Sequence, residues 1–569
     1  MEYWVFAAAI LLIMLLLMGK GYLDSLKNQK KFIEKLYQQY GADIEREYQP
    51  GELEKHISMY YKKHEKAHQI DDITWNDLNL DEIYRQMNYS HSAAGDEYLY
   101  YRLHTPMQDE EEFAKFEKYV RYFMEHDKER VDLQVQFARL GRMGKYSLYE
   151  YLDYLDTLGE RNNLKYYLAI GGVALSIGIM FVSVSFGLCA LLVILCLNMM
   201  NYYKEQKEID PYITSFRYIF RLMDAAGRIG KSTVEEIAPE RKRLLSCCKA
   251  TEGFRRNSFI ILSGMGNNPL EIILDYLRMV LYLDLIKFNQ MLRTIRKHIT
   301  EIDEMVTILG MLETVIVVGE YRAALKGGYC VPDFLEDGVP KEYNNSCYLK
   351  IEEMYHPLLK EPVKNTIEVK RGVLLTGSNA SGKSTFLRAV ALNAVLAQTI
   401  HTCMADSYRG NRFRIYSSMS LQDDIGSGDS YYMVEVKSIR RILESVREAE
   451  KDRKHVLCFV DEVLRGTNTV ERIAASTQIL KALAQPGILC FTATHDLELT
   501  NLLGNLYDNY HFEEEIVQDD IFFPYRLLKG PAVSRNAIAL LKVLGYDKGL
   551  VKDAERLADA FLQTGKWGC

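Results

Sequence analysis

A glycine-rich segment at residues 371–387, RGVLLTGSNASGKSTFL, has the residue types and spacing of a phosphate-binding loop. An apolar run leads into Gly377, and the spacing Gly-x-x-x-x-Gly-Lys-Ser follows. Glycines let the backbone curl so that its N–H groups face phosphate oxygens, and a helix that begins there adds a favourable dipole. The segment predicts nucleotide binding by Gly377, Ser378, Asn379, Ala380, Ser381, Gly382, Lys383, Ser384 and Thr385.

Two carboxylates follow a short apolar run at residues 456–462, VLCFVDE. Such a run is typical of a buried parallel strand. In a nucleotide site, Asp461 and the Ser384 hydroxyl are expected to bind Mg²⁺, Lys383 to reach the β- and γ-phosphates, and Glu462 to orient or deprotonate the attacking water. Two acids at a strand end can also be a simple helix cap, but their position after a phosphate-binding loop favours the metal and catalytic roles. ATP and Mg²⁺ are therefore the expected cofactors.

A third apolar run, at residues 488–493, ends in Thr494 and His495. A single histidine is usually structural. At the carboxyl end of a neighbouring strand, however, it lies where a group that senses the γ-phosphate is expected. The predicted catalytic residues are therefore Glu462, His495 and Lys383.

Two apolar stretches predict membrane segments. Residues 3–18 contain no charge and lysines follow them from Lys20 on, which predicts a transmembrane helix with the N-terminus outside. A cleaved signal peptide is the rival interpretation, disfavoured because no positive region precedes the run. Residues 166–203 exceed one span and are expected to form two, turning near residues 183–187. The alternative is a buried helical hairpin in a soluble core.

Three spans that start outside place residues 20–165 and 204–569 in the cytoplasm, which predicts a multi-pass protein of the cell membrane with membrane lipid as a partner. Helical periodicity between the spans predicts an all-α core. The expected organisation is a transmembrane helix at 1–19, polar juxtamembrane helices at 20–69, the first part of the helical core at 70–163, a transmembrane hairpin at 164–203, the second part of the core at 204–345, and an α/β P-loop ATPase domain at 346–569.

The bulk composition fits a folded protein of several domains and offers no support for a nucleic-acid binder. The chain has 569 residues and a formal net charge of -7, whereas most DNA-binding proteins carry a basic face. Its ten cysteines contain no C-x-x-C pair, which disfavours a zinc site and is typical of buried thiols in a reducing compartment.

Four segments in this order resemble the ATPase domain of the MutS family: GSNASGKST, DDIGSGDSYYMVE, VDEVLRGTNT and TATHDLELT. The resemblance covers about residues 346–569 and implies a P-loop fold of the ABC/MutS type. It implies that Ser427, Gly428 and Ser430 complete the ATP site of a partner subunit, and that residues 534–562 form a helix-turn-helix through which a homodimer assembles. Residues 88–106 and 302–321 resemble, more weakly, the start and the end of the MutS helical core.

The sequence departs from the family in several places. Ser378, Ala380 and Ser381 replace the usual proline, methionine and glycine, and Val363 stands about where the adenine-stacking aromatic is expected. No domain of the kind that reads mismatches is apparent. The resemblance therefore implies a membrane-anchored, dimeric, ATP-driven conformational switch whose DNA binding, if present, is weak and not mismatch-specific.

Two other functions are weighed against this one. The first is a membrane-tethered DNA-binding ATPase of mismatch repair or recombination, for which residues 241–243 and 293–297 are the basic candidates. The second is a transporter of the ABC kind, disfavoured because the Ser-Gly-Gly-Gln signature is missing. The protein partner and the biological process are not encoded in any motif of the chain.

Overall fold

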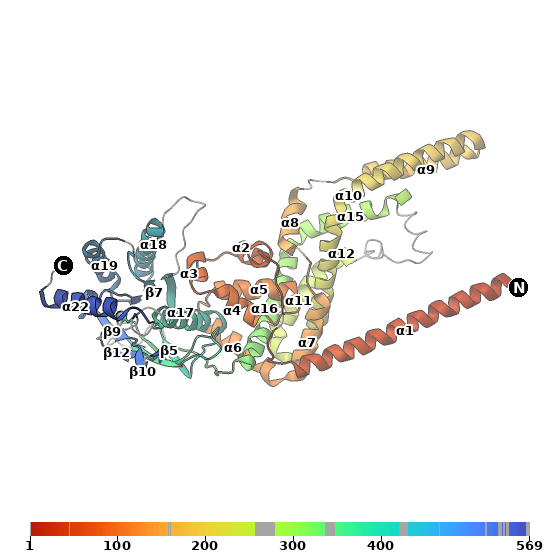
Figure 1. Cartoon of the computed structure of the whole chain (residues 1–569). Coiled ribbons are helices and arrows are strands. Elements are labelled where there is room, and N and C mark those ends of the chain that lie inside the picture. The colour runs from red at the N-terminus through yellow and green to blue at the C-terminus, as the bar shows by residue number, and fades with distance from the viewer. Residues whose placement is uncertain are drawn as a thin grey trace. The chain divides into compact units, whose positions relative to one another are not determined.

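The structure is a computed structural model that describes residues 2–44, 46–144, 146–157, 159, 161–255, 279–335, 347–378, 381–419, 431–465, 467–517, 520–532, 538, 541 and 545–564 (Figure 1). For residues 2–18 only the backbone is described. The chain forms two compact units. The helical unit comprises Met1–Glu65, Asn88–Tyr101 and Lys115–Tyr321, and the α/β unit comprises Lys66–Met87, Arg102–Ala114 and Arg322–Cys569.

The α/β unit is built on a six-stranded sheet in the order β12-β9-β4-β8-β7-β6. Its strands are β4 (Gly372–Thr376), β6 (Phe413–Ser418), β7 (His455–Asp461), β8 (Ile488–Ala493), β9 (Tyr507–His511) and β12 (Leu528–Lys529). Neighbours from β9 to β6 run parallel, and β12 is antiparallel to β9 at the edge. Every residue of β4 and β8 is buried, which is why these strands appear in the sequence as unbroken apolar runs.

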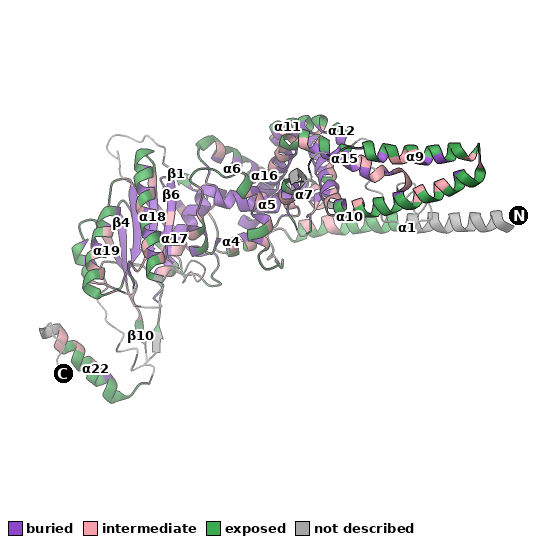
Figure 2. Ribbon diagram, turned by 90° about the horizontal axis from the view of Figure 1, so that it is seen from above, coloured by how far each residue is buried: buried purple, intermediate pink, exposed green. Residues whose placement is uncertain are grey.

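A second sheet, in the order β1-β5-β2-β3, belongs to the same unit. It consists of β1 (Asp333–Phe334), β2 (Leu349–Met354), β3 (Asn365–Val369) and β5 (Ser407–Gly410), while β10 (Glu515–Val517) pairs only with β11 (Asp520–Phe522). Buried and exposed residues alternate along β2 and β3, as expected for a sheet with one covered face. Helix α17 (Lys383–Ile400) contacts β6, β7 and β8 of the first sheet and β2 of the second, so nearly all of it is buried (Figure 2).

The remaining helices of the α/β unit are α3 (Asp72–Asp77), α4 (Leu80–Met87), α18 (Tyr431–Lys451), α19 (Thr469–Leu483), α20 (Glu498–Leu502) and α22 (Lys548–Thr564). Helix α3 is held to the end of β6, because the Ser417 hydroxyl donates to Asp77 at 2.6 Å. Residues 66–87 therefore join the α/β unit, although the sequence predicts residues 70–163 as one part of the helical core. Of the predicted terminal helix-turn-helix, the structure describes α22 and a few residues before it.

The helical unit contains α1 (Glu2–Gln38), a π-helix at Leu53–Ile57, α2 (Met59–Lys63), α7 (Asp127–Leu140), α8 (Leu148–Thr157), α9 (Leu164–Met180), α10 (Val184–Gly230), a 3₁₀-helix at Glu235–Ile237, α11 (Ala238–Ala250), α12 (Glu252–Arg255) and α15 (Leu283–Lys297). Helices α5 (Ala93–His104), α6 (Glu110–Glu125) and α16 (Ile299–Ala324) contribute residues to both units. Helix α1 is continuous to Gln38, so the predicted boundary at residue 19 does not interrupt it.

Helices α5 and α16 pack closely at a glycine of α16. A Cβ atom on Gly310 would lie 2.6 Å from the Ala94 carbonyl oxygen, so any larger residue would push the helices apart. Near the same contact the buried Glu313 carboxylate accepts hydrogen bonds from the backbone N–H and the hydroxyl of Ser92. The two segments that resemble the start and the end of a MutS core thus lie side by side.

The stretch from α9 to α10 is a helical hairpin in which most residues are exposed or intermediate (Figure 2), including many large apolar ones. Its turn lies at residues 181–183, slightly before the predicted position, and Phe181 and Val182 are 90% and 91% exposed. Within the described part of the chain, Val184–Ile209 is the one stretch long and apolar enough to cross a membrane, and 11% of its apolar window is buried. Helix α9 is apolar but shorter. This exposure contradicts the alternative of a hairpin buried in a soluble core.

Candidate nucleotide site

The glycine-rich loop connects β4 to α17, as the sequence predicts. Gly377 has a φ of 143° and Gly382 a φ of 103°, backbone conformations that favour glycine. A Cβ atom on Gly377 would also lie 2.5 Å from the Phe512 carbonyl oxygen, so the loop has no room for a side chain there. Gly382 is the N-cap of α17, which directs the first N–H groups of that helix into the loop.

Lys383 is buried at the first position of α17. Its Nζ donates hydrogen bonds to the carbonyl oxygens of Gly377 at 2.9 Å and Ser378 at 2.7 Å. Burial lowers the pKa of Lys383, and the nearby carboxylates of Asp461 and Glu462 oppose that shift. The ammonium group is therefore held inside the curl of the loop, where a bound phosphate would lie.

Ser384 and Asp461 form the candidate Mg²⁺ site. The Ser384 hydroxyl donates to Asp461 Oδ2 at 2.5 Å, although the two residues come from α17 and β7. Burial raises the pKa of Asp461, and the hydrogen bond from Ser384 counteracts this. Mg²⁺ is usually bound by one or two protein oxygens together with substrate phosphates and water. The oxygen pair fits that pattern, and no group of three metal-ligating side chains occurs among the described residues.

Glu462 follows Asp461 at the end of β7 and has a φ of 56°. Its backbone N–H donates to the Ala493 carbonyl oxygen at 2.9 Å, which turns the side chain away from the strand. His495 Nε2 lies 3.0 Å from one carboxylate oxygen, and Arg465 Nε lies 3.0 Å from the other. The hydrogen bond from His495, helped by the positive charge of Arg465, lowers the pKa of Glu462. The carboxylate is thus kept ionised, as a general base requires.

Two supporting contacts were not predicted from the sequence. Arg472 of α19 makes two hydrogen bonds to Asp496, at 2.9 and 2.6 Å, and so fixes the residue after His495. Glu435 of α18 accepts hydrogen bonds from the backbone N–H groups of Leu464 and Arg465, directly after Glu462. Burial raises the pKa of Glu435. Glu435 closes the segment DDIGSGDSYYMVE, which is the only signal in the sequence that could have drawn attention to it.

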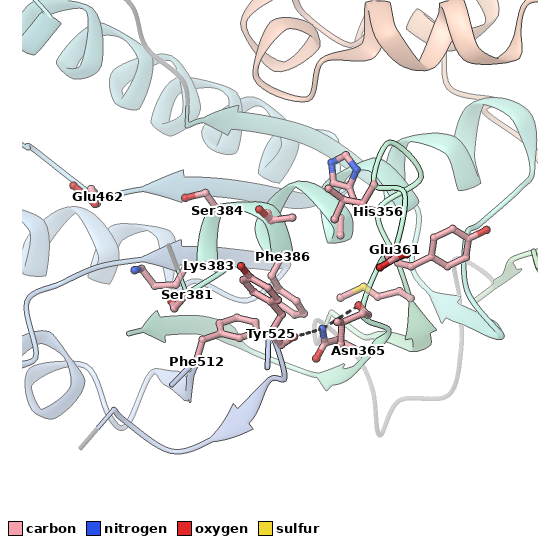
Figure 3. Close-up of a pocket in the computed structure, with 17 residues that line it drawn as sticks. His356, Glu361, Asn365, Ser381, Lys383, Ser384, Phe386, Glu462, Phe512 and Tyr525 are labelled. Carbon is pink, nitrogen blue, oxygen red and sulfur yellow. Dashed lines mark hydrogen bonds between the residues drawn. The ribbon is translucent and has the colours of Figure 1, made fainter. Parts of the chain in front are cut away.

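A cavity of about 430 Å³ continues from the loop toward β2 and β3. Figure 3 shows Lys383, Ser384 and Glu462 toward one end of this pocket and Asn365 and Tyr525 toward the other. Val363 also lines it, where the family aromatic was expected. Aromatic rings in the lining come instead from Tyr355, Phe386, Phe512 and Tyr525. Of these, Tyr525 lies against the glycine-rich loop, since a Cβ atom on Gly382 would lie 2.9 Å from Tyr525 Cδ1. Asn365 holds the backbone at Tyr525 by donating to its carbonyl oxygen at 2.9 Å.

The structure brings together Gly377, Ser378, Ser381, Gly382, Lys383, Ser384, Thr385, Asp461, Glu462 and His495. Predicted residues that lie outside the described part of the chain are Asn379, Ala380, Ser427, Gly428 and Ser430. No motif of the chain indicates Tyr525, because this residue comes about 140 positions after the loop and follows no motif spacing.

Proteins of known family resemble the α/β unit. Residues 373–562 match the family described as MutS domain V. The chain is 30% identical over 270 residues to the DNA mismatch repair protein MutS of Thermus thermophilus, which covers 47% of this chain and 31% of that protein. It is 29% identical over 304 residues to the DNA mismatch repair protein MutS of Clostridium kluyveri, which covers 50% of this chain and 33% of that protein. The chain thus spans about a third of the length of the curated relatives it matches.

Proposed function

Because the chain belongs to the MutS family through residues 373–562, we propose that it is a membrane-anchored, Mg²⁺-dependent ATP hydrolase that acts as a dimeric conformational switch. The observation that carries the ATPase proposal is the convergence of three groups on one phosphate-binding loop. Lys383 lies inside the loop, Ser384 is 2.5 Å from Asp461, and Glu462 is 3.0 Å from His495.

We assign a role to each of these residues from its position. Lys383 and the N–H groups at the start of α17 bind the phosphates and neutralise part of their charge. Glu462 accepts a proton from the attacking water, and His495 orients the carboxylate. Ser384 and Asp461 would hold Mg²⁺, which would supply positive charge to offset the negative charge that develops on the phosphates. We assign the base-stacking role to the Tyr525 ring, in place of an aromatic at Val363.

Two substitutions test the ATPase. Glu462→Gln should keep ATP binding and lower turnover about 100-fold or more, because the general base is removed while the shape is kept. Lys383→Ala should weaken ATP binding by at least about tenfold, or 1.4 kcal/mol, because the phosphates lose a buried cation. Nucleotide binding and phosphate release are measured on the detergent-solubilised full chain.

The matched control is Glu450→Gln on the exposed last turn of α18, which makes the same chemical change at a residue that does not line the pocket. This variant should hydrolyse ATP at the parent rate. Hydrolysis by Glu462→Gln at the parent rate would refute the assignment of the general base.

The dimeric part of the proposal rests on the resemblance of residues 423–435 to the family segment that completes a partner's ATP site. In this arrangement Ser430 of one subunit faces the γ-phosphate bound by the other. Lys383→Ala and Ser430→Ala should each abolish turnover alone. In mixed dimers one site receives an intact Lys383 and an intact Ser430, so partial activity should return on mixing.

Mixing two preparations of the same variant is the control for that experiment and should restore nothing. Differential tags verify that mixed dimers have formed. If these dimers show no activity, and if each site can hydrolyse ATP without the other, the proposal that Ser430 acts across the dimer is wrong. Single-turnover measurement in the mixture separates this case from two sites that must fire together.

The membrane part of the proposal is supported by the hairpin of α9 and α10. Its apolar side chains are exposed, and charged side chains are paired at its base, where Lys165 and Tyr166 both donate to Glu205. Arg161 donates to Glu208 at 2.9 Å at the same level. Apolar side chains above a ring of tyrosine and charged residues are typical of a segment that enters lipid. We propose that this hairpin and the apolar start of α1 anchor the chain, with the ATPase in the cytoplasm.

Mismatch repair is the function named for the relatives, and we do not extend it to this chain. Two of the basic residues that could bind DNA, Arg241 and Arg243, are paired with carboxylates. Arg243 Nε lies 2.6 Å from Glu304, and Arg241 Nη1 lies 3.4 Å from Glu235. We therefore propose that DNA is bound weakly and without mismatch preference, or not at all.

A further inference from the structure

Two cysteines of the α/β unit face each other across a single antiparallel bridge. Cys330 lies between α16 and β1, and Cys403 lies between α17 and β5. Each backbone N–H donates to the other residue's carbonyl oxygen at 2.9 Å, so the two residues form a closely spaced, hydrogen-bonded pair. Residues paired in this way have Cα atoms about 5.5 Å apart, which is within the range that a disulfide bridges.

The two cysteines differ in their surroundings. Cys330 is half-buried, whereas Cys403 is fully buried and its thiol donates to the Asn393 carbonyl oxygen at 3.8 Å. The neighbouring Cys403 thiol lowers the pKa of Cys330, and burial raises the pKa of Cys403. The positive charge of Arg322 favours the thiolate at both positions. Thiolate character and access are what make a cysteine reactive toward peroxides.

We propose that Cys330 and Cys403 form a peroxide-reactive thiol pair, in which Cys330 is oxidised first and Cys403 then closes a reversible disulfide. The Cys330 thiolate attacks one oxygen of hydrogen peroxide, which yields a sulfenic acid at Cys330 and hydroxide. The Cys403 sulfur attacks the Cys330 sulfur, the S–O bond breaks, and the hydroxyl group leaves as water with the Cys403 proton. Two electrons pass from the thiols to the peroxide, and a thiol reductant reverses the bond.

The position of the pair gives the disulfide a local structural effect. Cys403 follows α17 by three residues, and α17 begins at Lys383 of the phosphate-binding loop. Arg322 already ties the two segments, because its guanidinium donates to Thr402 Oγ1 at 2.9 Å and to the His401 carbonyl oxygen at 2.8 Å. The disulfide would add a covalent link between the end of α17 and the chain that leads into β1.

The chain contains a matched control pair. Cys458 of β7 and Cys490 of β8 are register partners on adjacent parallel strands. Both are fully buried in the sheet, so they share the proximity of the first pair but lack its access to solvent. If proximity alone decided oxidation, the two pairs would react alike.

The test treats the reduced, folded full chain in detergent with hydrogen peroxide, blocks remaining thiols with N-ethylmaleimide, and maps cross-links by mass spectrometry. A peptide joining Cys330 to Cys403 should form and disappear with dithiothreitol, while Cys458 and Cys490 stay reduced. Cys403→Ser should stop the reaction at a Cys330 sulfenic acid that dimedone traps, and Cys330→Ser should leave Cys403 unmodified.

Three results would overturn the proposal. The first is a native chain in which the Cys330–Cys403 link never forms, and the second is a link that forms only after unfolding in urea. The third is a Cys403→Ser variant in which dimedone labels Cys330 no faster than the half-buried Cys248 of α11. Circular dichroism confirms that each serine variant is folded before it is scored.

Discussion

Glu462 is the residue to which we assign the role of general base, and its environment constrains both its backbone and its carboxylate. Its backbone lies in the left-handed region, and both oxygens are held by side chains of positive or titratable character. A residue other than glycine adopts this conformation only where the surroundings enforce it. The hydrogen bond from its N–H to Ala493 of the neighbouring strand provides that constraint.

The lowered pKa of Glu462 has a consequence for pH dependence. A carboxyl whose pKa is lowered on folding stays ionised until the pH falls through that lowered value, and the stabilisation by its partners is lost over the same range. His495→Ala removes the largest cause of the shift, so the pKa of Glu462 should rise toward its ordinary value. We therefore expect the acidic limb of the kcat/KM profile for ATP to move to higher pH.

The measurement is ATP turnover as a function of pH for the parent, His495→Ala and a control variant, His126→Ala, whose side chain is exposed outside the α/β unit. The control should reproduce the parent profile. A lower rate for His495→Ala with an unmoved acidic limb would mean that a group other than Glu462 sets that limb.

At the scale of elements, the site depends on where neighbouring strands end. β8 lies between β4 and β7 and is parallel to both, so the loop after β4, the two acids at the end of β7 and the histidine after β8 emerge at one edge of the sheet. Helix α18 also contacts this edge of the sheet, because Glu435 accepts hydrogen bonds from the loop that follows Glu462. Glu435 thus links α18 to the backbone of Leu464 and Arg465, two and three residues after Glu462.

The hairpin of α9 and α10 is the element on which the membrane proposal can be tested without inserting new residues. Cys189 and Cys196 lie on α10 and are exposed on the protein surface. If lipid covers the hairpin, both thiols should be unreactive toward a charged, impermeant maleimide in intact membranes and should react after denaturation. Lipid excludes the charged reagent even though no protein atom covers the thiols.

Engineered cysteines complete the topology test and control for reagent access. A cysteine at position 2 should react from outside the cell, whereas cysteines at exposed positions between 25 and 60 or between 500 and 569 should react only after lysis. Labelling of residues 500–569 in intact cells would contradict a cytoplasmic ATPase. Rapid labelling of Cys189 and Cys196 in membranes would contradict insertion of the hairpin.

At the scale of the whole molecule, DNA binding is the property in which we expect this chain to differ from the mismatch repair proteins it resembles. Mismatch discrimination needs a residue that wedges into a weakened base step and contacts that hold the kinked duplex. Non-specific binding needs only basic side chains along one face. In the described part of the chain, the candidate residues Arg241 and Arg243 are paired with carboxylates, and the formal net charge is -7.

We expect the detergent-solubilised chain to bind a homoduplex and a single-mismatch duplex equally, with an affinity that falls steeply as salt increases or that is too weak to measure. Fluorescence anisotropy at several salt concentrations, with each duplex matched in length, provides the comparison. A tenfold preference for the mismatch near physiological salt, about 1.4 kcal/mol, would restore mismatch repair as the leading function.

The amino-acid sequence by itself determined the parts of the site that follow directly from a buried strand. That Gly377, Gly382, Lys383, Ser384, Asp461, Glu462 and His495 lie near one another could be predicted, because unbroken apolar runs identify the central parallel strands and such strands end at a common edge. The apolar hairpin was predictable for a similar reason, since a long uncharged run is a local property of the chain.

Only the tertiary structure decided which distant residues complete the site. Tyr525, Asn365, Arg472 and Glu435 reach it through contacts between segments far apart in sequence, and no local spacing encodes such contacts. The exposure of the apolar hairpin also could not be predicted from the sequence, because the same apolar run could pack in a core or face outward. In the structure most of its residues in α9 and α10 are exposed. Local patterns specify backbone conformation, whereas the partners of a side chain depend on how the whole chain packs.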